Sequence, residues 1–471
     1  MQKGDRVMFI GRKEELTKLE KLYKTDKFQM PVIYGRRRIG KTALINEFTK
    51  DKPAISFTAI ESSKNQNLEN FSKCILKYAS GRDSDFLPSF GSFQEALEYV
   101  FEISRDKRIV LTIDEYPYLA KADATISSVL QSAIDRHKDN SKLFIILCGS
   151  SMSFMENQVL GYESPLYGRR TAQFKINPFT FFEIKEYMKP LDYYDTALLY
   201  GVSGGTPQYF LQYDRNLSAK ENIIDKILDT NSYLFEEPEN LLKQEVREAS
   251  LYNSVITAVA GGSTKLAEIA TKVSEETSAC SNCLKKLISL GIIKKETPFG
   301  EKQGRKSLYA VEDNLFRFWY RFIPNNISAL ENGMTDVIYD KISTQFDTYM
   351  GSIFEEICKQ YLWIKNRKGE LPFIFTSLGR WWGTDNATRT QEEIDIIAAD
   401  EDKAIFCECK WNNRPVGIEV LDKLVKRSSL VKFEKQYLFL FSKSGFTDEC
   451  RKAAESSDNI TLVSFDEMCD T

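Results

Sequence analysis

The sequence predicts an α/β protein of several domains, and three observations support this class. Four short apolar runs, at 30–34, 54–59, 109–113 and 143–148, alternate with segments of helical periodicity. Such alternation is typical of a parallel sheet that helices cover on both faces. The first run leads through a glycine loop directly into a helical pattern, and apolar strands return in the tail after residue 393. We therefore expect a parallel-sheet core, a helical middle and a second α/β domain.

Composition limits the classes of function. The chain has 471 residues, 42% of them hydrophobic and 28% charged, which suits a globular protein of about three domains. A net charge of -3 predicts no overall attraction to nucleic acid or to an anionic membrane, so such binding needs a local basic patch. No apolar run approaches 18 residues, and the N-terminus is polar. We expect a cytoplasmic protein that does not enter a membrane.

The single histidine and the scattered cysteines exclude several kinds of site. With only His137 present, at a polar helix end, we expect neither a catalytic histidine, a Ser-His-Asp triad nor a multi-histidine metal site. The nine cysteines include one C-x-x-C, Cys280 to Cys283, without a second pair at zinc spacing, and we assign it to helix packing. Cys407 and Cys409 flank Glu408 on a predicted strand and are also assigned to packing. Carboxylate, lysine, arginine and Mg²⁺ chemistry remain.

A phosphate-binding loop follows the first apolar run. It reads G-x-x-x-x-G-K-T, and its residues are Gly35, Arg36, Arg37, Arg38, Ile39, Gly40, Lys41 and Thr42, with Ala43 opening the helix. Backbone N–H groups of such a loop, together with the positive end of the helix, surround an anion. We predict that Lys41 reaches the β- and γ-phosphates of ATP and that the Thr42 hydroxyl holds Mg²⁺.

Two further strand ends carry polar side chains. The run at 109–113 ends in Asp114 and Glu115, the expected partners of a phosphate loop. Asp114 is predicted to hold Mg²⁺ directly or through water, and Glu115 to polarise the attacking water. The run at 143–148 ends in Ser150 and Ser151; Ser150 is our candidate for contact with the γ-phosphate, with Ser151 as the alternative.

Adjacent arginines follow this part of the chain. Arg169 and Arg170 supply a positive charge to the γ-phosphate in one interpretation and form a solvated basic turn in the other. A helical lid is predicted next, with glycines before Pro207 marking a tight turn that opens a helix.

Several motifs in order resemble the archaeal and bacterial ATPase family, a branch of the AAA+/STAND P-loop ATPases. They are F-I-G-R at 9–12, the G-R-R-R-I-G-K-T loop, I-D-E at 113–115, G-R-R at 168–170, N-P-F at 177–179 and G-G-T-P at 204–207. The resemblance covers roughly residues 5–240. It implies that Gly11 and Arg12 line the adenine pocket, that Pro207 touches the base from the lid, and that Arg169 or Arg170 is the γ-phosphate arginine.

The middle of the chain reads as three helices and a hairpin. The pattern from about 245 to 311 fits a winged helix-turn-helix with a basic, glycine-containing tip. Lys285, Lys286, Lys302, Arg305 and Lys306 could meet DNA phosphate, or the module only packs on the lid. A dense aromatic stretch at 313–322 is predicted to be a buried helix, and 325–339 a polar link.

A second constellation of charged residues lies in the tail. Glu408 and Lys410, two apart on a predicted strand, share one face of it, and a hairpin brings Asp395 to that face. The layout resembles the PD-(D/E)XK nuclease fold, which implies that Asp395 and Glu408 bind Mg²⁺ and that Lys410 stabilises charge or positions the attacking water. Glu355 on the preceding helix matches that fold's additional acid, with Glu356 as its rival.

The tail also resembles the uncharacterised, nuclease-like domain often fused to this ATPase family. We accordingly predict a P-loop ATPase core at 1–178, a helical lid at 179–244, a winged helix-turn-helix at 245–324 and a nuclease-like domain at 340–471. The first hypothesis is an ATPase whose nucleotide state controls a DNA-binding or DNA-cleaving tail. The second is a slow ATP-dependent switch or DNA-binding regulator with an inactive tail. A homo-oligomer is left open, because an arginine acting in trans would require one.

Overall fold

The computed structural model describes residues 9–81, 88–246, 248–302, 304 and 306–470. These residues form two compact units, Met1–Pro178 with Thr206–Gln208, and Phe179–Gly205 with Tyr209–Thr471. Within the described ranges, no helix has both the length and the apolar character needed to cross a membrane.

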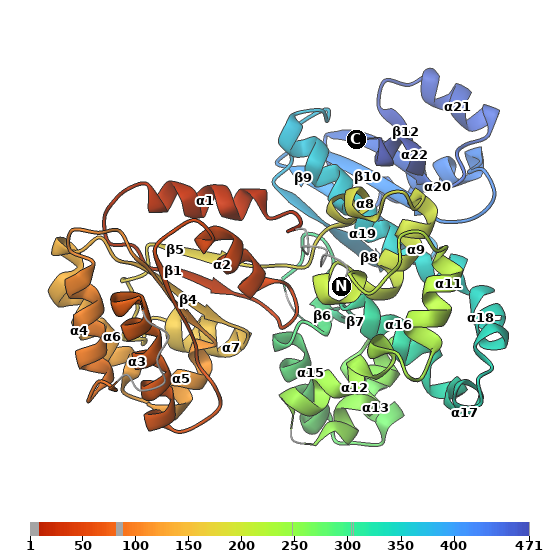
Figure 1. Cartoon of the computed structure of the whole chain (residues 1–471). Coiled ribbons are helices and arrows are strands. Elements are labelled where there is room, and N and C mark those ends of the chain that lie inside the picture. Colours follow the sequence, from red (N-terminus) through yellow and green to blue (C-terminus); the bar gives the residue numbers. More distant parts are fainter. Residues whose placement is uncertain (1–8, 82–87, 247, 303, 305, 471) are drawn as a thin grey trace. The chain divides into compact units, whose positions relative to one another are not determined.

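The first unit is built around a parallel sheet of five strands, in the order β2-β3-β4-β1-β5 (Figure 1). The strands are β1 (Pro31–Tyr34), β2 (Ala54–Thr58), β3 (Val110–Asp114), β4 (Phe144–Gly149) and β5 (Ala172–Lys175). The helical segments are α1 (Lys13–Tyr23), α2 (Lys41–Thr49), α3 (Lys64–Ser80), α4 (Phe93–Ile103), α5 (Tyr116–Ala122), α6 (Ile126–His137), η1 (Lys138–Asn140), α7 (Met152–Phe154) and η2 (Met155–Val159).

Helices cover both faces of this sheet, as the alternation of apolar runs predicts. Leu19 of α1 and Phe48 of α2 join Ile33 and Ile146 in one core cluster. Helices α3 to α6 bury a second cluster against the opposite face (Figure 1). The central strands β1, β3 and β4 are buried along their whole length, which is why they read as continuous apolar runs.

The edge strand β5 was not predicted. It has only four residues, and two of them, Gln173 and Lys175, are exposed. Its register with β1 places Phe174 opposite Ile33, so a single side chain of β5 joins the core. So short a strand with one buried side chain carries too little apolar pattern to be recognised.

The second unit begins with helices and a small hairpin. Its helical segments up to residue 343 are α8 (Phe181–Met188), α9 (Tyr193–Ser203), α10 (Pro207–Phe210, which starts in the first unit), α11 (Ala219–Ile223), η3 (Ile224–Leu228), α12 (Tyr233–Glu245), α13 (Ala249–Ala260), α14 (Leu266–Val273), α15 (Thr277–Ser289), α16 (Asn314–Phe322), η4 (Pro324–Asn326), α17 (Ile327–Glu331) and α18 (Thr335–Ser343). The hairpin is β6 (Ile293–Glu296) paired antiparallel with β7 (Leu308–Val311).

The prediction of a polar link at 325–339 is wrong. This segment contains α17 and most of α18, and it buries Leu330 and Ile338. Both helices are short and their other side chains are largely exposed, so the polar majority hid two anchoring apolar residues. The aromatic stretch before it is a buried helix as predicted, because Phe316 and Phe318 of α16 are fully enclosed.

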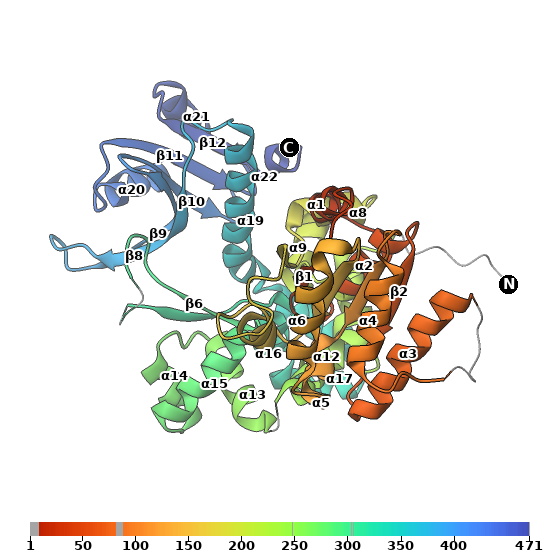
Figure 2. The same ribbon diagram turned by 90° about the vertical axis from the view of Figure 1, so that its left-hand side faces the viewer.

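A mixed five-stranded sheet in the order β12-β11-β10-β9-β8 ends the chain. Its elements are α19 (Phe346–Lys368), β8 (Ser377–Thr384), β9 (Gln391–Asp400), β10 (Lys403–Lys410), α20 (Ile418–Ser428), β11 (Lys435–Ser442), α21 (Asp448–Glu455), β12 (Ile460–Ser464) and α22 (Phe465–Cys469). Strands β8, β9 and β10 are antiparallel, whereas β10, β11 and β12 are parallel. Helix α19 lies along one face of the sheet (Figure 2), and α20 packs on the other.

Polar and aromatic contacts tie the helices after Pro178 to the C-terminal sheet domain. The backbone N–H of Phe181 on α8 donates to Gln360 Oε1 on α19 at 2.9 Å, and Gln360 Nε2 donates to the Tyr200 hydroxyl on α9 at 2.9 Å. The ring of Phe181 also meets that of Phe465 on α22, at 5.6 Å between centroids. These contacts explain why the helical segment and the tail form one unit.

Two glycines of this unit allow a stability prediction. A Cβ at Gly205 would lie 1.7 Å from the Phe179 carbonyl oxygen, whereas one at Gly351 on α19 would meet nothing within 4 Å. Gly205→Ala must displace backbone, and we expect a cost of about 2 kcal/mol or more. Gly351→Ala should instead stabilise by roughly 0.5–1 kcal/mol, because alanine favours a helix. Thermal melting of the full chain measures both; equal midpoints for the two variants would contradict the close packing at Gly205.

Candidate functional site

The phosphate loop is held by close packing between β1 and α2. A Cβ at Gly35 would lie 2.4 Å from the Ile176 carbonyl oxygen, so this position admits only glycine. Gly40, with φ of +84°, caps α2 in the left-handed region that favours glycine. The sequence motif thus occupies the strand–loop–helix setting that its chemistry requires.

Lys41 turns back onto its own loop. Its Nζ donates to the carbonyl oxygens of Gly35 at 3.0 Å and Arg36 at 2.8 Å. Burial lowers the pKa of Lys41, and the carboxylates of Glu115 and Asp114 partly oppose that effect. The ammonium is therefore enclosed beside the N-terminus of α2, with neutral carbonyl groups as acceptors.

Hydroxyl groups of Thr42 and of Ser150, which follows β4, donate to the two carboxylates at the end of β3. Thr42 Oγ1 donates to Asp114 Oδ2 at 2.7 Å, and the Glu115 backbone N–H donates to Asp114 Oδ1 at 2.9 Å. Ser150 Oγ donates to Glu115 Oε2 at 2.9 Å. The structure thus brings together Thr42, Asp114, Glu115 and Ser150, all four of which the sequence singled out from separate segments.

The thiol of Cys148 completes the surroundings of Asp114. Burial raises the pKa of Cys148 well above its ordinary value, and the Asp114 carboxylate beside it adds to the effect. Sequence reasoning placed Cys148 only in a buried strand. Its neutral thiol closes one side of the acidic centre.

Arg12 braces the phosphate loop from behind. Its guanidinium donates to the carbonyl oxygens of Ile39 at 3.1 Å and Asn177 at 2.7 Å, and the residue is buried. These contacts fasten residue 39 of the loop to the chain segment after β5. The structure therefore gives Arg12 a positioning contact, while adenine binding by Gly11 and Arg12 stays a prediction.

Pro207 lies beside the phosphate loop. A Cβ at Gly40 would be 3.7 Å from Pro207 Cγ, and the Gln208 backbone N–H points to the Arg38 carbonyl oxygen at 3.4 Å. Of the other loop arginines, Arg37 donates to the Tyr118 hydroxyl at 2.8 Å. The proline is thus within reach of a nucleotide bound to the loop.

The two candidate arginines have different surroundings. Arg169 forms a double contact with Asp135, from Nε to Oδ1 at 3.1 Å and from Nη2 to Oδ2 at 2.7 Å. Arg170 donates to the Leu160 carbonyl oxygen at 2.9 Å and lies over the Tyr167 ring. Burial raises the pKa of Tyr34, at the end of β1, and Arg170 lies close enough to oppose that rise. The charge of Arg170 thus acts on Tyr34, the residue before the phosphate loop, while Arg169 is paired with Asp135 of α6.

The second constellation lies where β9 and β10 separate. Their ladder ends at the pair Cys407 and Ile396, one position before Glu408 and Asp395. Beyond this last pair, the Cys409 backbone N–H donates to the side chain of Asp395, at Oδ2 and 2.8 Å, instead of to the backbone of β9. Burial raises the pKa of Asp395, and the carboxylates of Glu408 and Glu355 raise it further. The structure therefore gathers Asp395, Glu408 and Glu355 at one end of the sheet.

Glu355 and Glu356 of α19 have separate partners. Glu356 Oε1 accepts from Lys294 Nζ of the hairpin at 3.1 Å and from Lys359 Nζ at 2.9 Å. Burial would raise the pKa of Glu356, but Lys359 and Lys294 outweigh it and lower the pKa to about 2. Burial raises the pKa of Glu355, which Arg380 opposes. Glu356 is thus occupied by the hairpin, and Glu355 is the one that faces the Asp395 site.

Two cations hold Glu408. Lys410 Nζ contacts Glu408 Oε1 at 2.6 Å, and Arg427 Nη1 of α20 contacts Glu408 Oε2 at 3.2 Å. Arg427 also binds Glu392 Oε2 through Nε at 2.9 Å. Sequence reasoning missed Arg427, because nothing in the sequence around it indicates that its side chain faces Glu408, 19 positions earlier.

The two sites differ in how well they suit a magnesium ion. The Thr42 hydroxyl and the Asp114 carboxylate are hard oxygen ligands 2.7 Å apart, which fits Mg²⁺. In the tail, Glu408 is already neutralised by Lys410 and Arg427. Across the described ranges, no group of three or more His, Cys, Asp or Glu residues is arranged to hold a metal ion. The tail as it stands does not fit the metal that its motif implies.

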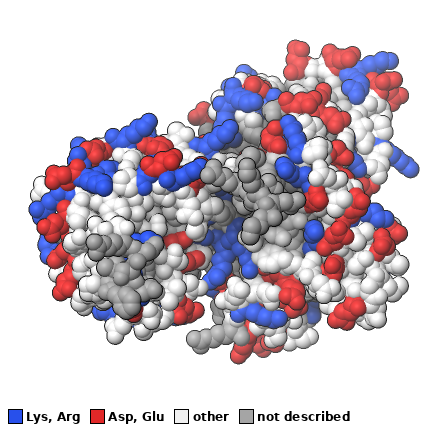
Figure 3. Space-filling view, in the orientation of Figure 1, with Lys and Arg blue, Asp and Glu red and all other residues white. Residues whose placement is uncertain are grey.

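The hairpin lies against the edge of the tail sheet. The Phe299 backbone N–H donates to the Arg380 carbonyl oxygen of β8 at 2.8 Å, and Trp382 Nε1 donates to the Lys306 carbonyl oxygen at 3.1 Å. Lys285, Lys302 and Lys306 are exposed, Lys286 is half-buried, and Arg305 lies outside the described residues. Acidic and basic side chains are interspersed on the face in Figure 3, so no large region of one sign dominates it.

Comparison with known proteins gives the family. Residues 9–213 match an ATPase domain found predominantly in Archaea, and residues 319–424 match a domain of archaeal and bacterial proteins of unknown function. The chain is 34% identical to the uncharacterized protein MJECL04 of Methanocaldococcus jannaschii over 98% of this chain and 99% of that protein. A 46-residue stretch is 50% identical to the uncharacterized ATP-binding protein MJ0423 of the same organism, covering 10% of this chain and 78% of that protein.

A solved structure shares the fold. The Walker-type ATPase PABY2304 of Pyrococcus abyssi superposes with a TM-score of 0.50 at 19% identity, over 68% of this chain and 98% of that one. The fold, the phosphate loop and the full-length relative agree. The chain belongs to the family that joins the archaeal P-loop ATPase domain to this C-terminal domain, and by that membership it is an ATPase.

Proposed function

We propose that the chain binds Mg²⁺–ATP at residues 35–42, hydrolyses it, and uses the nucleotide state to govern a tail that acts on DNA. The observation that carries the ATP site is the contact of Thr42 with Asp114 beside the enclosed Lys41. Lys41 exchanges the carbonyl oxygens of its loop for the β- and γ-phosphates. Thr42 and Asp114 hold Mg²⁺, which would neutralise charge on the phosphates. Glu115 leaves the Ser150 hydroxyl, orients the attacking water and accepts its proton.

Binding and turnover test this assignment separately. Lys41→Ala removes the ammonium that contacts the carbonyl oxygens of Gly35 and Arg36, so we expect ATP retention to be lost in calorimetry with magnesium present. Glu115→Gln keeps the shape and the Ser150 contact but cannot take a proton, so binding should persist while kcat falls about 10²–10⁴-fold. A wild-type rate equal to that of Lys41→Ala would instead favour a switch that holds ATP without turning it over.

Arg170 is proposed as the γ-phosphate arginine, with Arg169 as its matched control. Arg170 lies near Tyr34 at the start of the loop, whereas Arg169 is paired with Asp135 on α6. Because such an arginine stabilises charge that develops during transfer, Arg170→Ala should lower kcat by about 10³-fold. Arg169→Ala should leave kcat within about twofold, since an exposed ion pair contributes little. Steady-state turnover at saturating ATP measures both, and the reverse order would assign the role to Arg169.

We propose that the tail, at 340–471, is a nuclease-like domain. A helical lid at 179–244 and a winged helix-turn-helix at 245–324 precede it. The element order α19, β8, β9, β10, α20, β11 supports the first assignment, since it carries Asp395, Glu408 and Lys410 where two strands separate. Helices α13 to α15 followed by the β6–β7 hairpin support the second. Both modules belong to proteins that act on nucleic acid, and DNA is the proposed partner.

A tail that binds DNA without cutting it is the second candidate, and one observation favours it. Lys410 and Arg427 neutralise Glu408, the residue that would otherwise offer its carboxylate to a metal. Glu408 and Glu392 balance the charges of Lys410 and Arg427, and the partly exposed ammonium of Lys410 suits contact with a phosphate group. In this arrangement Lys410 positions the DNA backbone and Glu408 holds Lys410 and Arg427 in place.

Plasmid cleavage and duplex retention separate these two candidates. For a binding tail, we expect plasmid DNA to stay intact with Mg²⁺ or Mn²⁺, and Lys410→Ala to weaken duplex binding in fluorescence anisotropy and reduce its salt slope by about one. Lys403→Ala, which removes the same charge from the opposite end of β10, is the control and should change neither. Cleavage that disappears in Glu408→Gln would establish a cutting tail instead. Absence of both cleavage and DNA retention would remove DNA from the proposal.

A further inference from the structure

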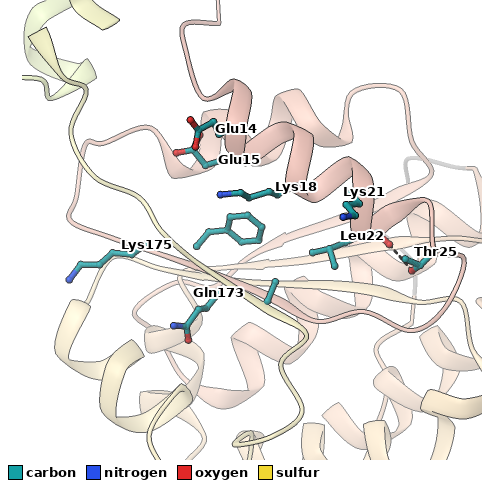
Figure 4. A pocket seen from close by; sticks show the side chains of 10 residues that line it. Glu14, Glu15, Lys18, Lys21, Leu22, Thr25, Gln173 and Lys175 are labelled. Atoms are coloured by element: carbon teal, nitrogen blue, oxygen red, sulfur yellow. Dashed lines mark hydrogen bonds between the residues drawn. The ribbon is translucent and has the colours of Figure 1, made fainter. Parts of the chain in front are cut away.

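A groove runs between α1 and the edge strand β5 of the first unit (Figure 4). It has a volume of about 560 Å³, and Leu22 and Phe174 contribute its apolar floor. Strand β5 pairs with β1 on one side only, and no described strand lies on its other side. An open edge presents unpaired backbone N–H and C=O groups to any strand that can approach it.

Charges are ordered along the helical wall of this groove. Figure 4 shows Glu14 and Glu15 at one end, Lys18 in the middle and Lys21 toward the other end. Lys18 and Lys21 are exposed and have no ion pair with any residue that the structure describes. Read along α1, the order is acid, acid, base, base.

The order of charges along α1 is self-complementary. When a second copy of α1 runs in the opposite direction, its basic residues lie opposite the acidic residues of the first copy. Two copies of α1 placed antiparallel would set Glu14 against Lys21 of the other copy, and Glu15 against Lys18 of the other copy. Helix α1 and β5 run in opposite directions along the groove: Glu14 and Glu15 lie at the same end as Lys175, and Thr25 lies at the other end (Figure 4). A single two-fold axis through the middle of the groove would therefore pair the helices and bring the two β5 edges together. A two-fold contact of this kind uses the same patch on both subunits.

We propose that the groove between α1 and β5 is the interface through which two copies of this chain form a symmetric dimer. Each copy covers the open edge of the other, and the ordered charges of α1 fix the antiparallel register. Glu15 of the charged wall lies 3.6 Å from Arg12, which fastens the phosphate loop, whereas Lys18 and Lys21 belong to neither the ATPase nor the DNA assignment; the lysine variant below therefore tests the interface apart from the ATP site. Paired surface charges are screened by salt, so the dimer should weaken as ionic strength rises.

Charge reversal tests the register directly in the full chain. Sedimentation equilibrium should give twice the 54.2 kDa mass of one chain. An acidic variant, Lys18→Glu with Lys21→Glu, and a basic variant, Glu14→Lys with Glu15→Lys, should each sediment as monomers. Mixing the two variants, or combining all four substitutions in one chain, restores complementarity and should restore the dimer.

Two controls keep this test interpretable. Lys13→Glu with Lys24→Glu, at the first residue of α1 and at the residue after its end, makes the same charge change outside the groove lining, and it should stay dimeric. Unchanged thermal midpoints would show that the reversed variants remain folded. The proposal is overturned if the wild-type chain is a monomer, or if the dimer persists in both charge-reversed variants. It is also overturned if the chain stays monomeric and binds a different protein at this groove.

Discussion

The buried ammonium of Lys41 is the constraint on which the nucleotide site depends. A charged group removed from water is costly unless polar partners compensate it. Here the compensation comes from two neutral carbonyl groups of the loop, those of Gly35 and Arg36. A triphosphate would supply full negative charge in the same place. The loop must keep its shape while Lys41 changes partners, which explains why Gly35 is packed against a carbonyl and why Arg12 fastens the loop from behind.

The two candidate sites differ in the groups that bind their carboxylates. Asp114 accepts from the Thr42 hydroxyl and Glu115 from the Ser150 hydroxyl. A neutral hydroxyl can yield its place to a cation or a water without breaking an ion pair. Glu408, in contrast, is buried between two cations, and removing one partner of a buried pair costs about 3–5 kcal/mol. The ATP site is therefore ready to accept ligands, whereas the tail site would first have to be opened.

Much of this could be predicted from the sequence, and the misses have physical causes. The central strands and the ATPase family were recognisable, because fully buried parallel strands read as apolar runs and the phosphate loop has a fixed spacing. Strand β5 has too few residues, and α17 and α18 bury too few, to show a period. Arg427 was out of reach for a different reason. Its partner lies across a strand–helix crossover, and such pairing is a property of the fold rather than of the local sequence.

Helix α19 links three parts of the second unit with adjacent side chains. Gln360 binds α8 and α9, Glu356 binds Lys294 of the hairpin, and Glu355 faces Asp395. Neighbouring residues on a helix point about 100° apart, so a rotation of the α19 backbone that moves Glu356 moves Glu355 as well. A helix of 23 residues transmits such a rotation along its length rather than absorbing it. A movement of the α8–α9 pair or of the hairpin that carried α19 with it would therefore change the approach of Glu355 to Asp395.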